Sequence, residues 1–128
     1  MSILCLWQKL RHFISVDRIL EQKKENAMIN VIASISIATG SLSGFLEIFR
    51  ANMLKVREER GCIEYFPLVD IDAKLAPQIL DENVVTIIEK WESLEALREH
   101  LEAPHMLAYR EKVKNIVTGL SLKVLREA

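Results

Sequence analysis

A strand and a helix follow one another within residues 28–61, which have the sequence MINVIASISIATGSLSGFLEIFRANMLKVREERG. Apolar and more polar side chains alternate over residues 28–38, and this period of two predicts a strand with one buried face. Between Ser41 and Arg60, intervals of four, four and three residues separate the apolar side chains of one helical stripe, namely Phe45, Phe49, Met53 and Val56. Gly61 then stands where helices commonly end in a left-handed residue. We therefore predict a strand over 28–38 and a helix over 41–60.

The same two periodicities predict the elements downstream. In chain order they are strand Cys62–Val69, a polar connection at 70–83, strand Val84–Trp91, a helix after Ser93, a helix from Pro104 and strand Val117–Leu125. Pro67 indicates an edge position or a bulge for the second strand, because proline cannot donate to a ladder. The order β-α-β-β-α-β, with the second helix broken at Pro104, predicts an α+β, ferredoxin-like (split β-α-β) fold with a four-stranded antiparallel sheet.

Helices on one face of such a sheet leave the other face uncovered. We expect that face to carry apolar residues, and an exposed apolar patch of this size is unusual for a monomer. Two sheets that pack face to face would cover it. The sequence therefore predicts a homodimer.

The composition fits one globular domain without a nucleic-acid partner. The chain has 128 residues, half of them hydrophobic, with 17 basic and 18 acidic side chains and a formal net charge of −1. This length suits a single domain, which we assign to residues 28–128. Because there is no basic excess, the electrostatic footprint of a nucleic-acid binder is missing.

Residues 1–27 form an N-terminal extension whose apolar side chains fall roughly at helical spacing. We expect it to be helical, and three roles stay open for it. It could pack on the domain or on a dimer partner, it could be a flexible leader, or it could lie on a membrane surface.

The cysteines and the N-terminus favour a cytoplasmic location. The two cysteines, Cys5 and Cys62, cannot build a disulfide framework. The first seven residues lack a basic region, and charged residues interrupt the apolar run that follows. We therefore expect neither a signal peptide nor a membrane span.

Three motifs together resemble the antibiotic biosynthesis monooxygenase (ABM) domain, a family of small dimeric α+β barrels that includes quinol monooxygenases. They are REERGCIEY at Arg57–Tyr65, EKWESLEALREH at Glu89–His100 and APHM at Ala103–Met106. The resemblance covers residues 28–126. It is specific for the fold and family and much less so for the substrate.

The resemblance implies a cofactor-independent monooxygenase, which works without flavin, haem or metal. It implies a pocket between the sheet and the helices that takes a small aromatic or quinol-type substrate and dioxygen. Substrate deprotonation, electron transfer from the anion to dioxygen and breakdown of a peroxy intermediate would follow. The protein must then supply a base, hydrogen-bond donors and a dry apolar cavity.

Glu89, Trp91 and His105 are the predicted catalytic residues. Glu89 and Trp91 share one strand face with Ile87, so burial would raise the pKa of the Glu89 carboxyl toward that of a usable base. A pairing of Glu89 with an arginine, Arg57 or Arg110, is the structural alternative. Trp91 could stack on a flat substrate or serve as a core anchor. 

Substrate-binding roles are predicted for Tyr65, His100, Tyr109 and Asn30. His100 and His105 flank Pro104, so we expect them on different helices rather than as the i, i+4 pair of a zinc helix, and we expect no metal site. His105 begins the last helix, where the dipole favours a neutral imidazole suited to a base. We expect Glu59 to bond backbone groups around Gly61.

Three other functions stay open. A non-oxidative enzyme of the same family, of the autoinducer-processing type, could isomerise or degrade a small polar metabolite. Its phosphorylated substrates would need a cluster of basic side chains, which no strand offers. Haem degradation in related folds uses a first-strand asparagine, where this chain has Ala33. A ligand-binding module without turnover is the last alternative.

Overall fold

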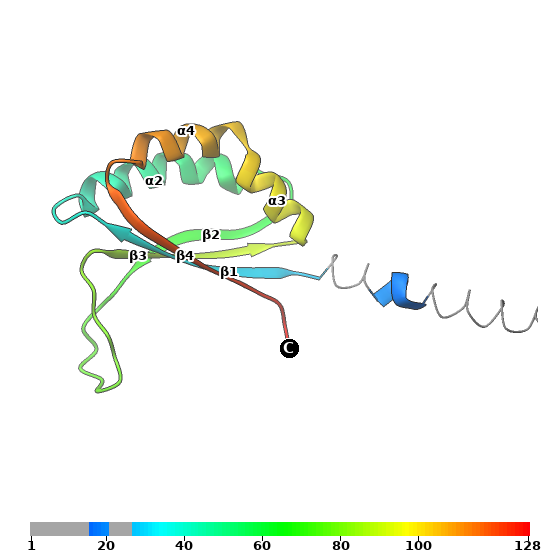
Figure 1. The fold of residues 1–128 in the computed structure, drawn as a ribbon, viewed down its shortest axis with the longest axis horizontal. Coiled ribbons are helices and arrows are strands. Elements are labelled where there is room, and N and C mark those ends of the chain that lie inside the picture. Colours follow the sequence, from blue (N-terminus) through cyan, green and yellow to red (C-terminus); the bar gives the residue numbers. More distant parts are fainter. Residues whose placement is uncertain (1–15, 21–26) are drawn as a thin grey trace, which may run out of the picture.

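The computed structural model describes residues 16–20 and 27–128, which include one complete α+β domain. Its elements, in chain order, are β1 (Ile29–Ile37), α2 (Leu42–Arg57), β2 (Cys62–Val69), β3 (Val84–Trp91), α3 (Leu94–Glu102), α4 (Pro104–Val113) and β4 (Val117–Leu125). This order confirms the predicted β-α-β-β-α-β arrangement, with the second helix divided into α3 and α4 at Pro104 (Figure 1).

The four strands form one antiparallel sheet in the order β2-β3-β1-β4. β1 is central, and its Ala33 lies opposite Ile87 of β3 and Leu122 of β4. Tyr65 of β2 lies opposite Glu89 of β3, so these two side chains share a face of the sheet. The edge position of β2 agrees with the interpretation of Pro67, which occupies that strand.

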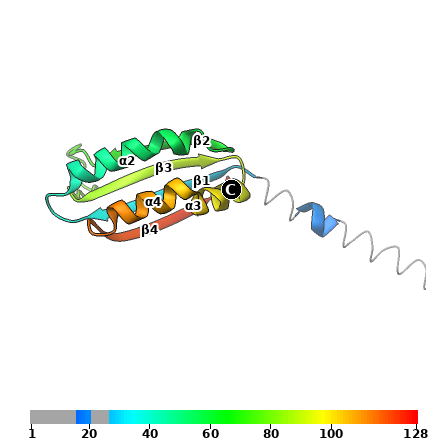
Figure 2. The same cartoon turned by 90° about the horizontal axis from the view of Figure 1, so that it is seen from above.

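All three helices of the domain lie on one face of the sheet (Figures 1 and 2). α2 packs against β2 and beside α4, and seen from above these two helices run side by side. The core between helices and sheet contains every second residue of β1 together with the buried side of the α2 stripe, namely Phe45, Phe49 and Val56. The apolar faces of the strands and helices therefore pack together in one hydrophobic layer.

The end of α2 differs from the prediction and matters for the site. The helix ends at Arg57 rather than at Arg60, because the N–H groups of Glu58 and Glu59 bond carbonyls only three residues back. Gly61 then adopts a φ of +86°, which confirms the left-handed turn expected there. The helix therefore ends about one turn early, while β2 begins at Cys62 as predicted.

At α3 the predicted cap is present. The Ser93 hydroxyl accepts a hydrogen bond from the N–H of Ala96 at 3.1 Å. At α2, by contrast, Ser41 occupies the cap position without a side-chain hydrogen bond.

The face of the sheet away from the helices is mixed in character. Alternate β1 residues, among them Asn30, Ile32 and Ser34, belong to it, and exposed apolar side chains such as Ile32, Leu68 and Leu125 alternate there with hydroxyl and lysine side chains. The apolar patch is thus more interrupted than the sequence suggested. The loop over residues 70–83 extends on the same side of the sheet (Figure 1).

The predicted helical extension over 1–27 falls mostly outside the described residues. Within it, residues 16–20 are helical. No helix in the part of the chain that the structure describes is long and apolar enough to cross a membrane.

Gly40 and Gly61 have nearly the same positive φ, so alanine variants of the two can show whether Gly61 is also constrained by its close approach to Ala96. A Cβ on Gly61 would lie 2.6 Å from the Cβ of Ala96, whereas a Cβ on Gly40, with φ of +85°, would meet nothing within 4 Å. Gly40→Ala should therefore cost only the left-handed backbone, about 1 kcal/mol of unfolding free energy. Gly61→Ala adds a clash between two elements and should cost roughly 2–4 kcal/mol. Urea denaturation of both variants measures the difference, and equal losses would contradict the contact with α3.

Candidate active site

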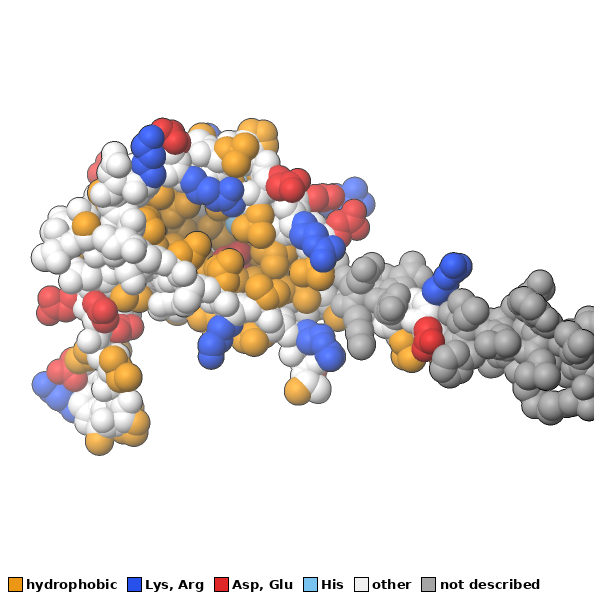
Figure 3. All heavy atoms as spheres, in the orientation of Figure 1, with side chains coloured by type: hydrophobic (Ala, Val, Ile, Leu, Met, Phe, Trp, Pro, Cys, Tyr) orange, Lys and Arg blue, Asp and Glu red, His pale blue; other side chains and the backbone are white. Residues whose placement is uncertain are grey.

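A cavity of about 280 Å³ opens on the helix-bearing side of the sheet, where no helix covers β4. Its walls come from all four strands and from α3 and α4: Ala33, Ile35, Tyr65, Ile87, Glu89, His100, Leu101, Met106, Tyr109, Arg110, Val113, Lys114, Val117, Leu120 and Leu122. Leu120 and Leu122 line its rim and are 62% and 48% exposed. Figure 3 shows the hollow ringed by hydrophobic side chains, with acidic and histidine atoms visible inside it.

Glu89 is the carboxylate in this cavity, and it is held by a tryptophan. Its side chain is buried, and Oε1 accepts a hydrogen bond of 3.0 Å from the indole Nε1–H of Trp91. Neither arginine proposed as a partner pairs with it. Arg57 donates instead to the carbonyl of Tyr65 at 2.9 Å, and Arg110 donates to the carbonyl of Leu101 at 2.7 Å.

Burial gives Glu89 the proton affinity of a base that works near neutral pH. Loss of hydration raises the pKa of its carboxyl to about 7, and the negative charge of Glu59 acts in the same direction. The hydrogen bond from Trp91 partly opposes this rise because it stabilises the carboxylate. Near pH 7 the group is therefore divided between its two forms, which suits it to accept and return protons.

Trp91 is placed behind Glu89 rather than in the cavity wall. Its side chain is fully buried, and its ring centroid lies 4.5 Å from that of His100. Of the two roles considered for it, the geometry matches the core anchor, which also orients the carboxylate. It is a positioning residue in this arrangement.

His100 lies between two carboxylates. Its Nδ1 is 2.8 Å from Oε2 of Glu59, and its Nε2, on the other side of the ring, is 4.0 Å from Oε1 of Glu89. Burial lowers the pKa of His100, although the bond to Glu59 works against that change. A neutral imidazole that donates Nδ1–H to Glu59 leaves the lone pair of Nε2 toward Glu89 and the cavity.

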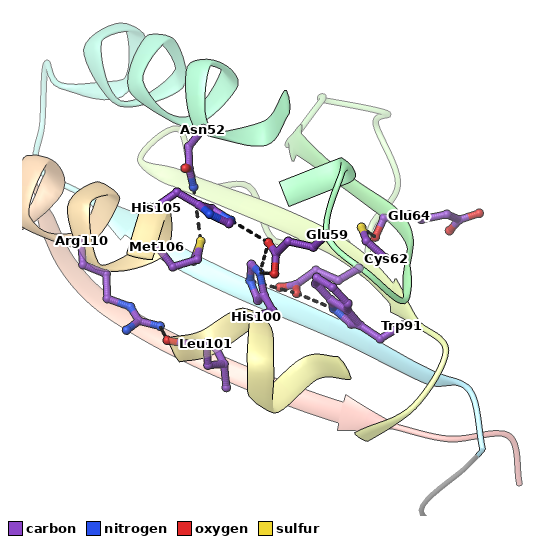
Figure 4. Close-up of polar contacts among 11 residues, drawn as sticks. Asn52, Glu59, Cys62, Glu64, Trp91, His100, Leu101, His105, Met106 and Arg110 are labelled. Carbon is purple, nitrogen blue, oxygen red and sulfur yellow. Dashed lines mark hydrogen bonds and ion pairs between the residues drawn. The ribbon is translucent and has the colours of Figure 1, made fainter. Parts of the chain in front are cut away.

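His105 reaches the same carboxylate from a different helix. Its Nε2 is 2.9 Å from Oε2 of Glu59 (Figure 4). The prediction that the two histidines occupy separate helices is confirmed, since His100 belongs to α3 and His105 to α4. His105 does not line the cavity that contains Glu89; it lines a groove between α2 and α4.

The two tyrosines predicted to bind substrate both line the cavity, whereas Asn30 does not. Burial raises the pKa of Tyr65 and of Tyr109, so both phenols stay protonated and can donate hydrogen bonds. Asn30 lies opposite Lys90 and Leu125, on the face of the sheet away from the helices. The expectation that it contacts a ligand in this cavity is therefore not supported.

Glu59 is the site residue that sequence reasoning missed. Instead of bonding backbone groups around Gly61, its carboxylate bridges both histidines. The early end of α2 and the left-handed turn at Gly61 direct the chain so that this side chain meets α3 and α4. An acidic residue two positions before a turn glycine, in a chain with two histidines around one proline, was the available signal.

These side chains do not form a metal-binding group. Among residues 16–20 and 27–128, no three or more histidine, cysteine or acidic side chains are arranged to hold a metal ion. Glu59, Glu89, His100 and His105 form the polar centre of the site.

The raised pKa of Glu89 makes stability depend on pH in a defined direction. In the unfolded chain the carboxyl ionises near its ordinary value of 4.5, and in the fold only near 7. Between these values the folded state binds the extra proton, so this contribution to stability is present at low pH and is lost as pH rises through 7. Glu89→Gln should stabilise the fold at pH 8 relative to the wild type by up to about 3 kcal/mol and change little at pH 4. Thermal and urea denaturation at both pH values measures this, and an equal effect at both would show that the carboxyl is not perturbed.

The sequence has relatives of known family. The family model for antibiotic biosynthesis monooxygenase matches residues 28–112. Over 101 residues the chain is 36% identical to the protein named "Probable quinol monooxygenase YgiN" from Escherichia coli K12, and the alignment covers 77% of this chain and 97% of that protein.

Solved structures share the fold at lower identity. Rv0793 from Mycobacterium tuberculosis matches with a TM-score of 0.67 and 25% identity, over 80% of this chain and 96% of that one. PA3566 from Pseudomonas aeruginosa matches with a TM-score of 0.68 and 22% identity, over 81% and 97% of the two chains. Since the family model spans most of the domain and the E. coli relative is matched almost end to end, the chain belongs to the antibiotic biosynthesis monooxygenase family.

Proposed function

We propose that this protein is a monooxygenase that oxidises a small aromatic or quinol-type substrate with dioxygen and needs no cofactor. The observation that carries the proposal is Glu89, a buried carboxylate with a pKa of about 7 in a largely apolar cavity. Family membership and the printed name of the E. coli relative support the reaction class. The alternatives kept open by the sequence gain no specific support from the cavity.

The cavity suits a compact, flat and largely apolar molecule. A cavity on the order of 150 Å³ can hold benzene, so about 280 Å³ leaves room for one or two fused rings with their oxygen substituents. Aliphatic side chains dominate the walls, and Tyr65, Tyr109 and Glu89 supply a few polar groups to orient a phenolic hydroxyl.

Glu89 would begin the reaction by accepting the proton of a quinol hydroxyl. The resulting anion is electron-rich enough to pass an electron to dioxygen, and recombination at a ring carbon gives a peroxide. Loss of the hydrogen on that carbon with cleavage of the O–O bond yields a hydroxyquinone and water. The balance is one quinol and one dioxygen to one hydroxyquinone and one water, with the quinol as the source of all four electrons.

Two cationic side chains of the cavity wall favour the anionic intermediate. Arg110 and Lys114 both come from the end of α4 that faces the cavity. The neutral carbonyl of Leu101 holds Arg110, which keeps its net positive charge near the rim, whereas the exposed carboxylate of Glu111 partly offsets the charge of Lys114. Positive charge near a low-dielectric cavity stabilises a bound phenolate.

A homodimer is part of this proposal. The open face of the sheet carries Ile32, Leu68 and Leu125 as exposed apolar side chains, and a second copy of the sheet would cover them. Light scattering at micromolar concentration should give a mass of about 29 kDa, twice the 14.7 kDa of one chain. A mass equal to that of one chain would remove this part of the proposal.

Oxygen uptake tests the activity directly. The purified, metal-stripped protein should consume oxygen saturably with members of a panel of quinols and polyhydroxylated aromatics, after subtraction of autoxidation. Glu89→Gln removes the base at nearly constant shape and should lower kcat/KM by about 100-fold or more. Uptake that is absent in the wild type, or unchanged in this variant, would contradict the proposal.

The pH profile of the same assay provides a second readout. Since the base must be ionised, kcat/KM should rise with pH through about 7. Trp91→Phe removes the hydrogen bond that lowers the pKa of Glu89, so the rise should move to higher pH.

A further inference from the structure

Four polar side chains form a line that leads from the cavity to a different surface of the domain. Glu89 in the cavity faces Nε2 of His100. The Nδ1 of His100 bonds Glu59, and Glu59 bonds Nε2 of His105 (Figure 4). The three separations are 4.0, 2.8 and 2.9 Å. The second and third separations are those of ordinary hydrogen bonds. A small movement of either side chain would bring the first pair to hydrogen-bond distance as well.

Side-chain exposure is 8% for Glu89 and then increases along the line from His100 outward. It is 2% for His100, 13% for Glu59 and 21% for His105. The far end lies in the groove between α2 and α4, which is also lined by Asn52, Lys55 and Lys112 and is separate from the cavity. The line therefore joins a buried interior to solvent.

The proposed reaction has a use for such a connection, and in that respect the inference rests on the proposed function. The water formed in each turnover carries two hydrogens that the quinol loses. A single carboxylate holds only one proton at a time, so Glu89 must be relieved of its first proton before it can act again.

We propose that His100, Glu59 and His105 are a proton relay that exchanges protons between Glu89 and the groove during turnover. Glu89 passes its proton to Nε2 of His100 while the Nδ1 proton of His100 moves to Glu59 and on to Nε2 of His105, which accepts it when the imidazole carries its own proton on Nδ1. The proton returns by the same route when reduced oxygen leaves as water, which restores the starting tautomer of His100. No net proton enters or leaves in one cycle.

The other ionisable groups beside the line favour this path. Tyr65 and Tyr109 keep their protons because burial raises their pKa values, and Cys62 does so because its pKa is raised to about 11. The positive charge of Arg110 on α4 disfavours an imidazolium at His100. A proton that reaches His100 is thus passed onward rather than kept.

Proton exchange in the ligand-free protein tests the relay without any substrate. The His100 Nδ1 proton should exchange with water, measured by NMR, about tenfold or more faster in the wild type than in Glu59→Gln, because an amide cannot accept and pass on a proton. Lys112→Ala changes the same groove outside the line and should exchange as the wild type does. Equal rates in the wild type and Glu59→Gln would overturn the relay whether or not a quinol is oxidised.

Turnover gives the second test. His105→Ala and Glu59→Gln should lower kcat about tenfold or more with little change in KM, since neither side chain lines the cavity. Millimolar imidazole should restore His105→Ala, whose groove is open to solvent, and should leave Glu59→Gln unchanged. A rise in KM alone, or no rescue of His105→Ala, would overturn the relay. Absence of any quinol oxidation in the wild type would instead refute the proposed function.

Discussion

The hydrogen bond from the Trp91 indole to the buried Glu89 carboxylate is the constraint around which the domain is arranged. Placing a carboxylate among aliphatic side chains is costly unless it is protonated or hydrogen-bonded, and here one donor provides partial compensation. The compensation is incomplete, so the group retains a proton affinity near neutrality. The site depends on that balance. A carboxylate with all of its hydrogen bonds formed would be a poor base, and a buried carboxylate with none would destabilise the fold.

Helix geometry explains why the histidines can share one carboxylate. Five residues along a continuous α-helix correspond to a rotation of about 140°, which would point the two rings to different sides. Pro104 ends α3 and begins α4, and the change of axis brings His100 and His105 to Glu59 from two directions. The helix break at Pro104 thus positions the two histidines of the site as well as shaping the fold.

The fold could be predicted from the sequence because strand and helix periodicities are local. The alternation in β1, the stripe on α2 and the cap at Ser93 each depend on a few neighbouring residues, and the structure agrees with them. The burial of Glu89 and its position beside Trp91 followed from the same alternation. Glu59 could not be placed in this way, because its position depends on how tightly α2 ends. The alternation in β1 already put Asn30 on the face away from the core, and its expected contact with a ligand disregarded that constraint.

Because the rim on β4 is exposed, the residues that shape the mouth of the cavity differ from the residues that stabilise the fold. Leu120 and Leu122 shape the cavity, yet 62% and 48% of their surfaces are already in water, so replacing them removes little buried area from the core. Glu89, Trp91 and His100 are instead locked into the interior. Substitutions at the rim can accordingly change the shape of the cavity mouth while the interior of the domain stays as it is.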